Sequence, residues 1–332
     1  MGVMDTSTSY LGLRLPHPFM AGASPMGYSL DAIKRLEDAG CAAVVLHSLF
    51  EEQISLATEG RLAHVDPLDP QMSDRVSAYP APADYKYGPD GYANHIVKVK
   101  QAVRIPVIAS LNGHSGESWL KFARVIEQAG ADALEFNYYD VATSSKVPAQ
   151  SIEDNVVHAV DNLTQSIAIP IAVKLIPYYT SFGHVAVALD GAGASGLVLF
   201  NRFYQSTVDT RTMTLVPQVD LSTSAELPLR LHWLALLRGQ IRASLAASGG
   251  VATADDGIKA LLAGADAVQL VSALLRHGPG HVAIMRQGLE RWLEWQHVDS
   301  VTAMIGRASF HAHPDPASLE RAHYIRTLQS WI

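Results

Sequence analysis

Residues Ala129 to Asn137 read Ala-Gly-Ala-Asp-Ala-Leu-Glu-Phe-Asn, and this phrase decides the fold because the chain contains four versions of it. Each version has Ala-Gly, a short apolar run and then a polar residue, and the other three cover 39–47, 192–201 and 263–272. A glycine just past a helix adopts the left-handed conformation that ends it. The apolar run suits a strand buried on both faces of a parallel sheet. The repeat therefore predicts helices that alternate with parallel strands.

Four further strands are expected between these copies, at 18–21, 105–110, 169–174 and 244–248. Helical patterns lie between them, at 30–39, 117–129, 151–165, 181–189 and 253–262. Eight strands alternating with helices predict a (β/α)8 TIM barrel, with the active site at the carboxyl ends of the strands. The alternative is a doubly wound open sheet.

The length of 332 residues exceeds the ~250 of a bare barrel, so we expect one domain over 1–332 with insertions. Two insertions, at about 51–90 and 202–228, follow even-numbered strands and are predicted to fold over the mouth of the barrel. The first is rich in proline, which favours an ordered loop over a separate domain. A helical tail is expected at about 281–332.

The composition excludes several classes of protein. Acidic residues outnumber basic ones by 32 to 25 without a basic cluster, which argues against a nucleic-acid surface. No apolar stretch reaches the ~20 residues of a membrane span. The single cysteine, Cys41, favours a reducing cytoplasm. His311 and His313 are predicted to be a surface pair, so no metal site is expected.

Polar residues at the predicted strand ends are the candidates for chemistry. Gly249 and Gly250 follow the seventh strand and Ser272 follows the eighth, where barrels bind phosphate; the alternative is a tight turn. Lys174 ends the fifth strand, and its ammonium is expected in the mouth or in solvent. Asn137 and Asn201 end strands four and six, and their amides suit either a flat heterocyclic ligand or a loop contact.

These motifs resemble the dihydroorotate dehydrogenase family of FMN-dependent barrels over most of the chain. Residues 10–15 resemble the family's N-terminal hairpin, and Val173-Lys174-Leu175-Ile176-Pro177 resembles its Val-Lys-Leu-x-Pro. Further resemblances are carried by His17-Pro18-Phe19-Met20, Ala23-Ser24, Ser110-Leu111-Asn112-Gly113, Leu134-Glu135-Phe136-Asn137, Ser248-Gly249-Gly250-Val251 and the segment 264–269.

The resemblance implies FMN across the strand ends, and it assigns the residues around it. The phosphate would lie at Gly249, Gly250 and Ser272. Lys174 would lie near the N1/O2 edge of the flavin and stabilise the reduced form. The other cofactor contacts implied are Ala23, Ser24, Ser48, Asn137 and Asn201, of which the two asparagines would also hold the substrate.

Four positions depart from the family pattern. Asp140 occupies the place of the catalytic Cys or Ser, and Ala142 that of a substrate-binding Asn. His47 replaces a lysine and Arg202 replaces a serine. Asp140 could act as the base if burial raised its pKa, or be a solvated loop carboxylate. His47, with a pKa near the working range, could support the flavin or share proton transfer, and Arg202 could bind a substrate carboxylate.

The resemblance implies an FMN-dependent oxidoreductase of CH–CH groups, acting on a small acid such as dihydroorotate or orotate in pyrimidine biosynthesis. It also implies a soluble electron acceptor and a possible homodimer, with no nucleic-acid or membrane partner expected. Three alternatives stay open. The flavin enzyme could act on another substrate, the protein could be a non-catalytic flavin-binding accessory protein, or it could be a flavin-free phosphate-binding lyase in which Lys174 forms a Schiff base.

Overall fold

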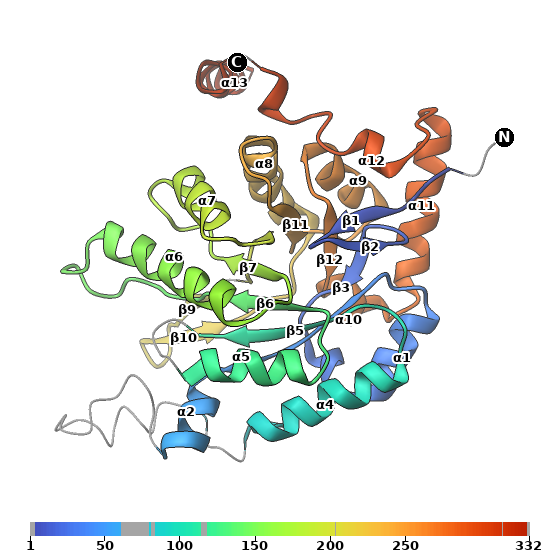
Figure 1. The fold of residues 1–332 in the computed structure, drawn as a ribbon. Coiled ribbons are helices and arrows are strands. Elements are labelled where there is room, and N and C mark those ends of the chain that lie inside the picture. Colours follow the sequence, from blue (N-terminus) through green and yellow to red (C-terminus); the bar gives the residue numbers. More distant parts are fainter. Residues whose placement is uncertain are drawn as a thin grey trace.

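Eight parallel strands close into a barrel in the computed structural model, which describes residues 4–60, 80, 84–113, 118–202, 204–313 and 315–330 (Figure 1). Around the barrel the strands are β11 (Ser244–Ser248), β12 (Ala267–Leu270), β3 (Phe19–Ala21), β4 (Val44–Phe50), β5 (Val107–Asn112), β6 (Ala133–Asn137), β7 (Ile171–Leu175) and β8 (Gly196–Leu199). The last of these along the chain, β12, pairs in parallel with the first, β3. The predicted TIM barrel is confirmed, and the open-sheet alternative is wrong.

Helices surround this barrel (Figure 1). They are α1 (Leu30–Asp38), α2 (Glu51–Glu59), α4 (Pro89–Ala102), α5 (Ser118–Gln128), α6 (Ala149–Ser166), α7 (Phe182–Gly191), α8 (Leu227–Leu237), α9 (Ala254–Ala263), α10 (Ser272–His277) and α11 (His281–Trp295), with the short turns η1 (Pro25–Tyr28) and η3 (Ser224–Glu226). The repeated glycines behave as predicted: Gly40, Gly130, Gly193 and Gly264 follow helix ends with φ of 82°, 90°, 92° and 131°.

Apolar side chains fill the amino-terminal part of the barrel interior. The strand residues in this buried cluster are Met20, Val45, Ile108, Ala133, Ala172, Val198, Ala246 and Ala267. An N-terminal hairpin of β1 (Thr8–Tyr10) and β2 (Leu13–Leu15) adds Tyr10 and Leu11 to the same cluster. The Leu11 N–H donates to Ser244 Oγ at 3.2 Å, and Thr8 Oγ1 donates to the Asp266 carbonyl at 2.9 Å. The barrel is therefore a packed core that is closed at its amino-terminal end.

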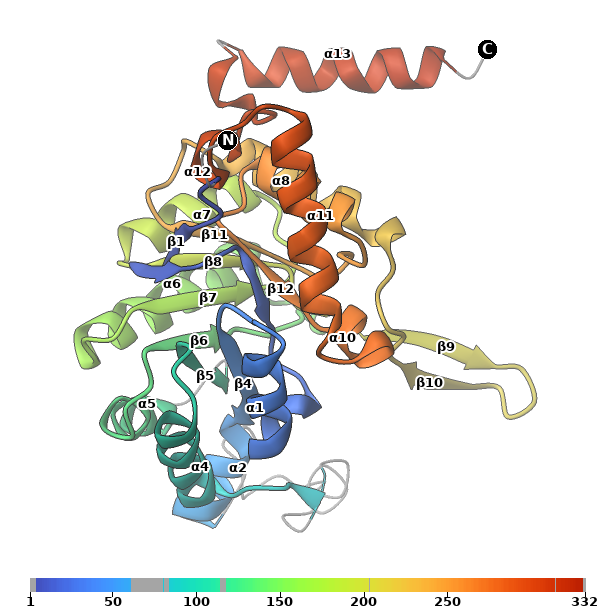
Figure 2. The same ribbon diagram turned by 90° about the vertical axis from the view of Figure 1, so that its right-hand side faces the viewer.

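The second insertion differs in part from expectation. Its strands β9 (Gln205–Asp209) and β10 (Thr214–Gln218) form an antiparallel hairpin that extends away from the barrel (Figure 2). The hairpin satisfies its own backbone ladder. After it the chain returns to the strand ends, where Ser222 contacts Ser272 and Gly250. The first insertion begins with α2, and its residues 61–79 and 81–83 lie outside the described residues.

The segment predicted as a C-terminal helical tail begins with α11. This helix packs against the barrel through the buried Val282, Met285 and Leu289. After it come α12 (Val301–Met304), η4 (Phe310–Ala312) and α13 (Pro316–Gln329). Helix α13 has no buried residue and lies at the periphery (Figure 2). Within the described ranges, no helix is long and apolar enough to cross a membrane.

Candidate active site

A layer of polar side chains lies above the apolar layer inside the barrel. Side chains alternate along a strand, so the residues two positions after the apolar layer also point inward. On β6, β7 and β12 these residues are Glu135, Lys174 and Gln269, whose exposed fractions are 1, 5 and 1%. A buried charge is tolerated only when it is paired and hydrogen-bonded. The three side chains must therefore satisfy one another.

Lys174, Glu135 and Gln269 form a closed ring of hydrogen bonds. Lys174 Nζ donates to Glu135 Oε1 and to Gln269 Oε1, each at 3.1 Å, and Gln269 Nε2 donates to Glu135 Oε2. The ring fixes a positive charge at the floor of the mouth and rules out the solvent-directed lysine considered from the sequence. An ammonium held between two acceptors also differs from the free amine that attacks a carbonyl.

The structure brings the two predicted asparagines together. Asn137 ends β6 and Asn201 follows β8, and Asn201 Nδ2 donates to Asn137 Oδ1 at 3.0 Å. This contact uses one donor hydrogen of one amide and one acceptor site of the other. Each amide has further hydrogen-bonding capacity, so the pair is suited to a flat ligand that carries both donors and acceptors.

Asp140 lies outside this ring, on the loop after β6, and is half-buried. Burial, and after it the negative charge of Asp140, raises the pKa of the Tyr138 phenol. The pKa of the Tyr179 phenol is also raised. Its burial is the largest cause, followed by the Tyr138 phenol and then by the charge of Asp140. The structure therefore places the Asp140 charge beside two tyrosines at the mouth. Its role as a base stays a prediction.

His47 lies in β4 among aromatic rings and is neutral at pH 7. Its Nδ1 is 3.3 Å from the Gly27 carbonyl, and its ring lies 3.9 Å from that of Tyr28. Because a carbonyl oxygen only accepts, Nδ1 carries the proton and Nε2 is an acceptor. Burial lowers the pKa of His47 to about 4. This differs from the expected pKa near the working range, and it gives the mouth an acceptor where the family has lysine.

The remaining cofactor candidates lie at two neighbouring strands. Ser48 Oγ is 2.8 Å from Ser110 Oγ, because an irregularity in β4 after Val45 brings Ser48 opposite Ser110. Ala23 and Ser24 follow β3, and Ser24 is the residue before η1. Ala23 and Ser24 thus lie just past the carboxyl end of β3, while Ser48 and Ser110 lie within β4 and β5.

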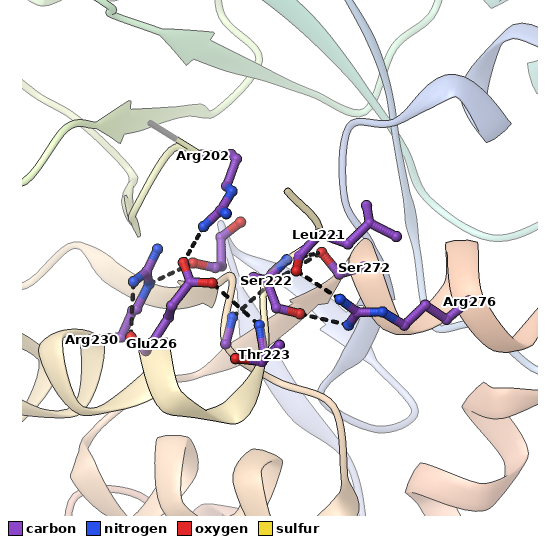
Figure 3. A network of polar contacts seen from close by, with 10 residues as sticks. Arg202, Leu221, Ser222, Thr223, Glu226, Arg230, Ser272 and Arg276 are labelled. Carbon is purple, nitrogen blue, oxygen red and sulfur yellow. Dashed lines mark hydrogen bonds and ion pairs between the residues drawn. The ribbon is translucent and has the colours of Figure 1, made fainter. Parts of the chain in front are cut away.

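Two of the predicted phosphate residues, Gly250 and Ser272, form a cradle around one serine hydroxyl, that of Ser222. Figure 3 shows Ser222 beside Ser272. The Gly250 N–H donates to Ser222 Oγ at 3.1 Å, and Ser222 Oγ is 2.9 Å from Ser272 Oγ. The Ser222 N–H also donates to Ser272 Oγ at 2.9 Å. Gly249 and Gly250 have φ of 82° and 81°, and a Cβ on Gly250 would lie 2.6 Å from the Leu227 nitrogen. The turn therefore requires glycine.

This cradle fits the phosphate of a flavin nucleotide. An oxygen atom, Ser222 Oγ, already lies within hydrogen-bond distance of both the Gly250 N–H and the Ser272 hydroxyl. A phosphate oxygen in place of Ser222 Oγ would accept from the Gly250 N–H and, with the Ser272 hydroxyl turned to donate, from Ser272, since backbone N–H groups and hydroxyls are its usual donors. Arg276 donates to the carbonyls of Leu221 and Ser222 at 2.7 Å each and holds this segment in place.

Arg202 follows Asn201 and reaches across the mouth to η3. Its NH1 forms an ion pair with Glu226 Oε2 (Figure 3). Its Nε is buried and has no hydrogen-bond partner within the described part of the chain. Arg230 lies on the other side of Glu226, and it is 94% buried, with 6% exposed.

Sequence reasoning missed Glu135, Gln269 and Ser222. Glu135 and Gln269 could have been found, because each is a polar residue inside an apolar strand, at the position that points inward with Lys174. Ser222 carried no comparable signal. It lies in an irregular segment after β10, and only the folded chain brings it to the cradle.

Three buried histidines make the stability depend on pH. Burial lowers the pKa of His17 and of His47 to about 4, and it also lowers that of His95. The folded pKa lies below the value of about 6.5 in an unfolded chain, so the unfolded chain binds protons first as the pH falls. Stability is therefore full above pH 6.5 and is lost toward pH 4, by roughly 3 kcal/mol at most for each of His17 and His47.

We expect the urea midpoint to fall steadily between pH 7.5 and 5.0. His17→Asn should reduce this slope, because His17 Nδ1 accepts from the Phe19 N–H and protonation would remove that acceptor. His313→Asn, at an exposed position, is the matched control. An unchanged midpoint over this range would contradict the expectation.

Comparisons with known proteins agree with this geometry. The sequence model of the dihydroorotate dehydrogenase family matches residues 85–293, more than half of the chain. The catalytic subunit of dihydroorotate dehydrogenase B (NAD(+)) from Thermoplasma volcanium is 24% identical over 92% of this chain and 98% of its own. Dihydroorotate dehydrogenase A (fumarate) from Lactobacillus delbrueckii is 25% identical over 93% of this chain and 100% of its own.

A third relative is named for dihydropyrimidines in general. The NAD-dependent dihydropyrimidine dehydrogenase subunit PreA of Escherichia coli is 23% identical over 97% of this chain and 80% of its own length. The family match, the closed barrel and the polar strand ends all lead to one assignment. The chain belongs to the dihydroorotate dehydrogenase family of flavin-dependent oxidoreductases.

Proposed function

We propose that the protein binds FMN and transfers hydride between it and a small acid such as dihydroorotate or orotate. The observation that carries this proposal is the buried ammonium of Lys174, fixed by Glu135 and Gln269 at the floor of the mouth. FMN, when bound, supplies the hydride acceptor and takes on negative charge when it is reduced. A fixed positive charge stabilises such a site without reorganisation.

The other residues have roles that follow from their positions. Gly249, Gly250 and Ser272 would hold the phosphate, while Ala23, Ser24 and Ser48 would line the flavin. The Asn137–Asn201 pair would orient the flat ring of the substrate through its amides. Asp140 would take the substrate proton, since it is the carboxylate on the loop after β6, and His47 would offer the neutral acceptor Nε2.

The absorption spectrum of the purified protein, followed by anaerobic addition of dihydroorotate, tests this function. We expect flavin bands that bleach when dihydroorotate is added. If flavin bands are present but persist after dihydroorotate is added, the protein binds flavin and the proposed substrate is wrong. A colourless protein that takes up no added FMN would overturn the proposal as a whole.

A dihydropyrimidine that lacks the carboxylate is the second candidate substrate. It is favoured by the similarity to the dihydropyrimidine dehydrogenase subunit and by the substrate loop, where Asp140 and Ala142 replace family residues. The same anaerobic experiment with dihydrouracil separates the two substrates, because only the true one bleaches the flavin rapidly.

We also propose a soluble electron acceptor, a homodimer and a cytoplasmic location. The names of the relatives give NAD(+) for one of those proteins and fumarate for another. The term catalytic subunit in one name supports a partner for electron transfer. Native mass measurement would establish the oligomeric state.

A further inference from the structure

A polar cavity lies next to the Asn137–Asn201 amide pair. Its volume is about 220 Å³, and its charged lining consists of Arg202, Glu226 and Arg230. Pro177, Tyr178, Asn201, Gln205, Ala225 and Leu229 complete the walls. Asn201 also donates to Asn137, so this arginine pocket opens directly next to the amide pair. A ligand on the amides could extend a substituent into the pocket.

The charges of the arginine pocket do not balance. Two guanidinium groups face one carboxylate, which leaves one excess positive charge in a chain whose formal net charge is −7. Burial lowers the pKa of Arg230, and the charge of Arg202 acts in the same direction against the opposing effect of Glu226. An anion in the pocket would relieve this repulsion between the arginines.

One guanidinium N–H of the pocket, on Arg202, has no acceptor in the part of the protein that is described, and an oxyanion could supply one. Arg202 Nε is buried without an acceptor among the residues that the structure describes. Arg230 uses Nε on the Ser248 carbonyl at 3.1 Å and NH1 on the Glu226 carbonyl at 2.9 Å. Its NH2 lies beside Gly249, 3.0 Å from the position of a Cβ there. A buried guanidinium N–H without a partner is costly, and a carboxylate or phosphate supplies matching acceptors.

Glu226 has the features of an internal substitute for such a ligand. Its Oε2 accepts from Arg202 NH1, while its Oε1 accepts from the Thr223 N–H at 3.3 Å (Figure 3). The side chains of Arg202 and Glu226 are 29 and 32% exposed, so the ion pair is open to exchange. An incoming anion could take over Arg202 while Glu226 keeps its contact at the start of η3.

We propose that Arg202 and Arg230 form an anion subsite that binds a carboxylate or phosphate group, and that Glu226 is the internal counter-ion displaced by it. The inference rests on the proposed function where it assigns this anion to the substrate. The phosphate of the cofactor is the other source of the same chemistry, since Arg230 lies next to the Gly249 turn. The subsite gives Arg202 the role of selecting substrates that carry an anionic group.

Calorimetric titration with orotate and with uracil tests the subsite, because the two share a ring and differ in the carboxylate. Full-length wild type, Arg202→Gln, Glu226→Gln and Arg242→Gln are compared, each with its flavin content measured by absorbance. We expect Arg202→Gln to weaken orotate binding by roughly ten- to a hundredfold. We expect Glu226→Gln to tighten it by about three- to tenfold, since the competing carboxylate is gone. Uracil binding should not change in any variant.

Arg242→Gln is the matched control, because the Arg242 side chain is 91% exposed and lies outside the pocket. A parallel titration of FMN against riboflavin separates the two sources of the anion. One outcome is that Arg202→Gln lowers the ratio of FMN affinity to riboflavin affinity while the affinity for orotate is unchanged. In that case the subsite is confirmed and its ligand is the cofactor phosphate.

Two results would overturn the subsite. One is that Arg202→Gln and Glu226→Gln bind orotate, FMN and riboflavin with the same affinities as the wild-type protein. The other is equal weakening by Arg202→Gln and Glu226→Gln, which would show that the ion pair only supports the fold. These results differ from those that would contradict the proposed function. If the proposed function is wrong, the wild-type protein itself has no flavin bands, or its bands do not bleach with dihydroorotate.

Discussion

Replacing Lys174 by methionine should lower the free energy of unfolding by about 3–5 kcal/mol, and the rate of flavin reduction by about 10²- to 10⁴-fold. Methionine retains much of the length of the side chain but removes the charge. Glu135, 1% exposed, would then be an uncompensated buried carboxylate. Urea unfolding measures the first effect, and anaerobic stopped-flow reduction of the flavin measures the second.

The double variant Lys174→Met with Glu135→Gln separates structure from chemistry. It removes both charges of the buried pair, and the remaining amides can still hydrogen-bond to each other. We expect it to recover most of the lost stability, while reduction of the flavin stays slow. Recovery of the reduction rate together with stability would show that Lys174 only supports the fold.

Replacing Gly250 by alanine should destabilise the protein by about 2–4 kcal/mol and weaken flavin binding at least about tenfold. The residue has φ of 81°, and its Cβ would lie 2.6 Å from the Leu227 nitrogen and 2.7 Å from the Leu227 Cα. Because these are backbone atoms at the start of α8, relief requires the turn or the helix to move. Either movement displaces the N–H that faces Ser222.

Gly130→Ala is the matched control for this substitution. Gly130 also has a positive φ, of 90°, but apart from its chain neighbours no atom of the described residues lies within 4 Å of its Cβ position. It therefore measures the backbone strain alone, about 1 kcal/mol. Urea unfolding and fluorescence titration with FMN compare the two variants. If Gly250→Ala and Gly130→Ala have the same stability and the same affinity for FMN, the Gly250 turn is not part of the phosphate cradle.

The barrel could be predicted from the sequence because its signals are local. Gly40, Gly130, Gly193 and Gly264 end helices through their own backbone preference, and the apolar run after each is sufficient to mark a strand. Parallel strands place their carboxyl ends at one end of a barrel. The positions of Asn137, Lys174 and Asn201 therefore followed from the ends of the runs, without any knowledge of contacts between them.

What could not be predicted depends on contacts between distant segments. Lys174 needs Glu135 and Gln269 from two other strands, and only closure of the barrel brings these side chains together. The lowered pKa of His47 comes from burial, and Tyr28 beside it lies on another element. The sequence shows that these residues are titratable but not how much water reaches them.

The hairpin that closes the base of the barrel also limits the direction from which the buried polar ring can be reached. Tyr10 and Leu11 pack into the apolar cluster at the amino-terminal end. A small molecule therefore approaches Lys174, Glu135 and Gln269 from the carboxyl ends of the strands and not through the base of the barrel.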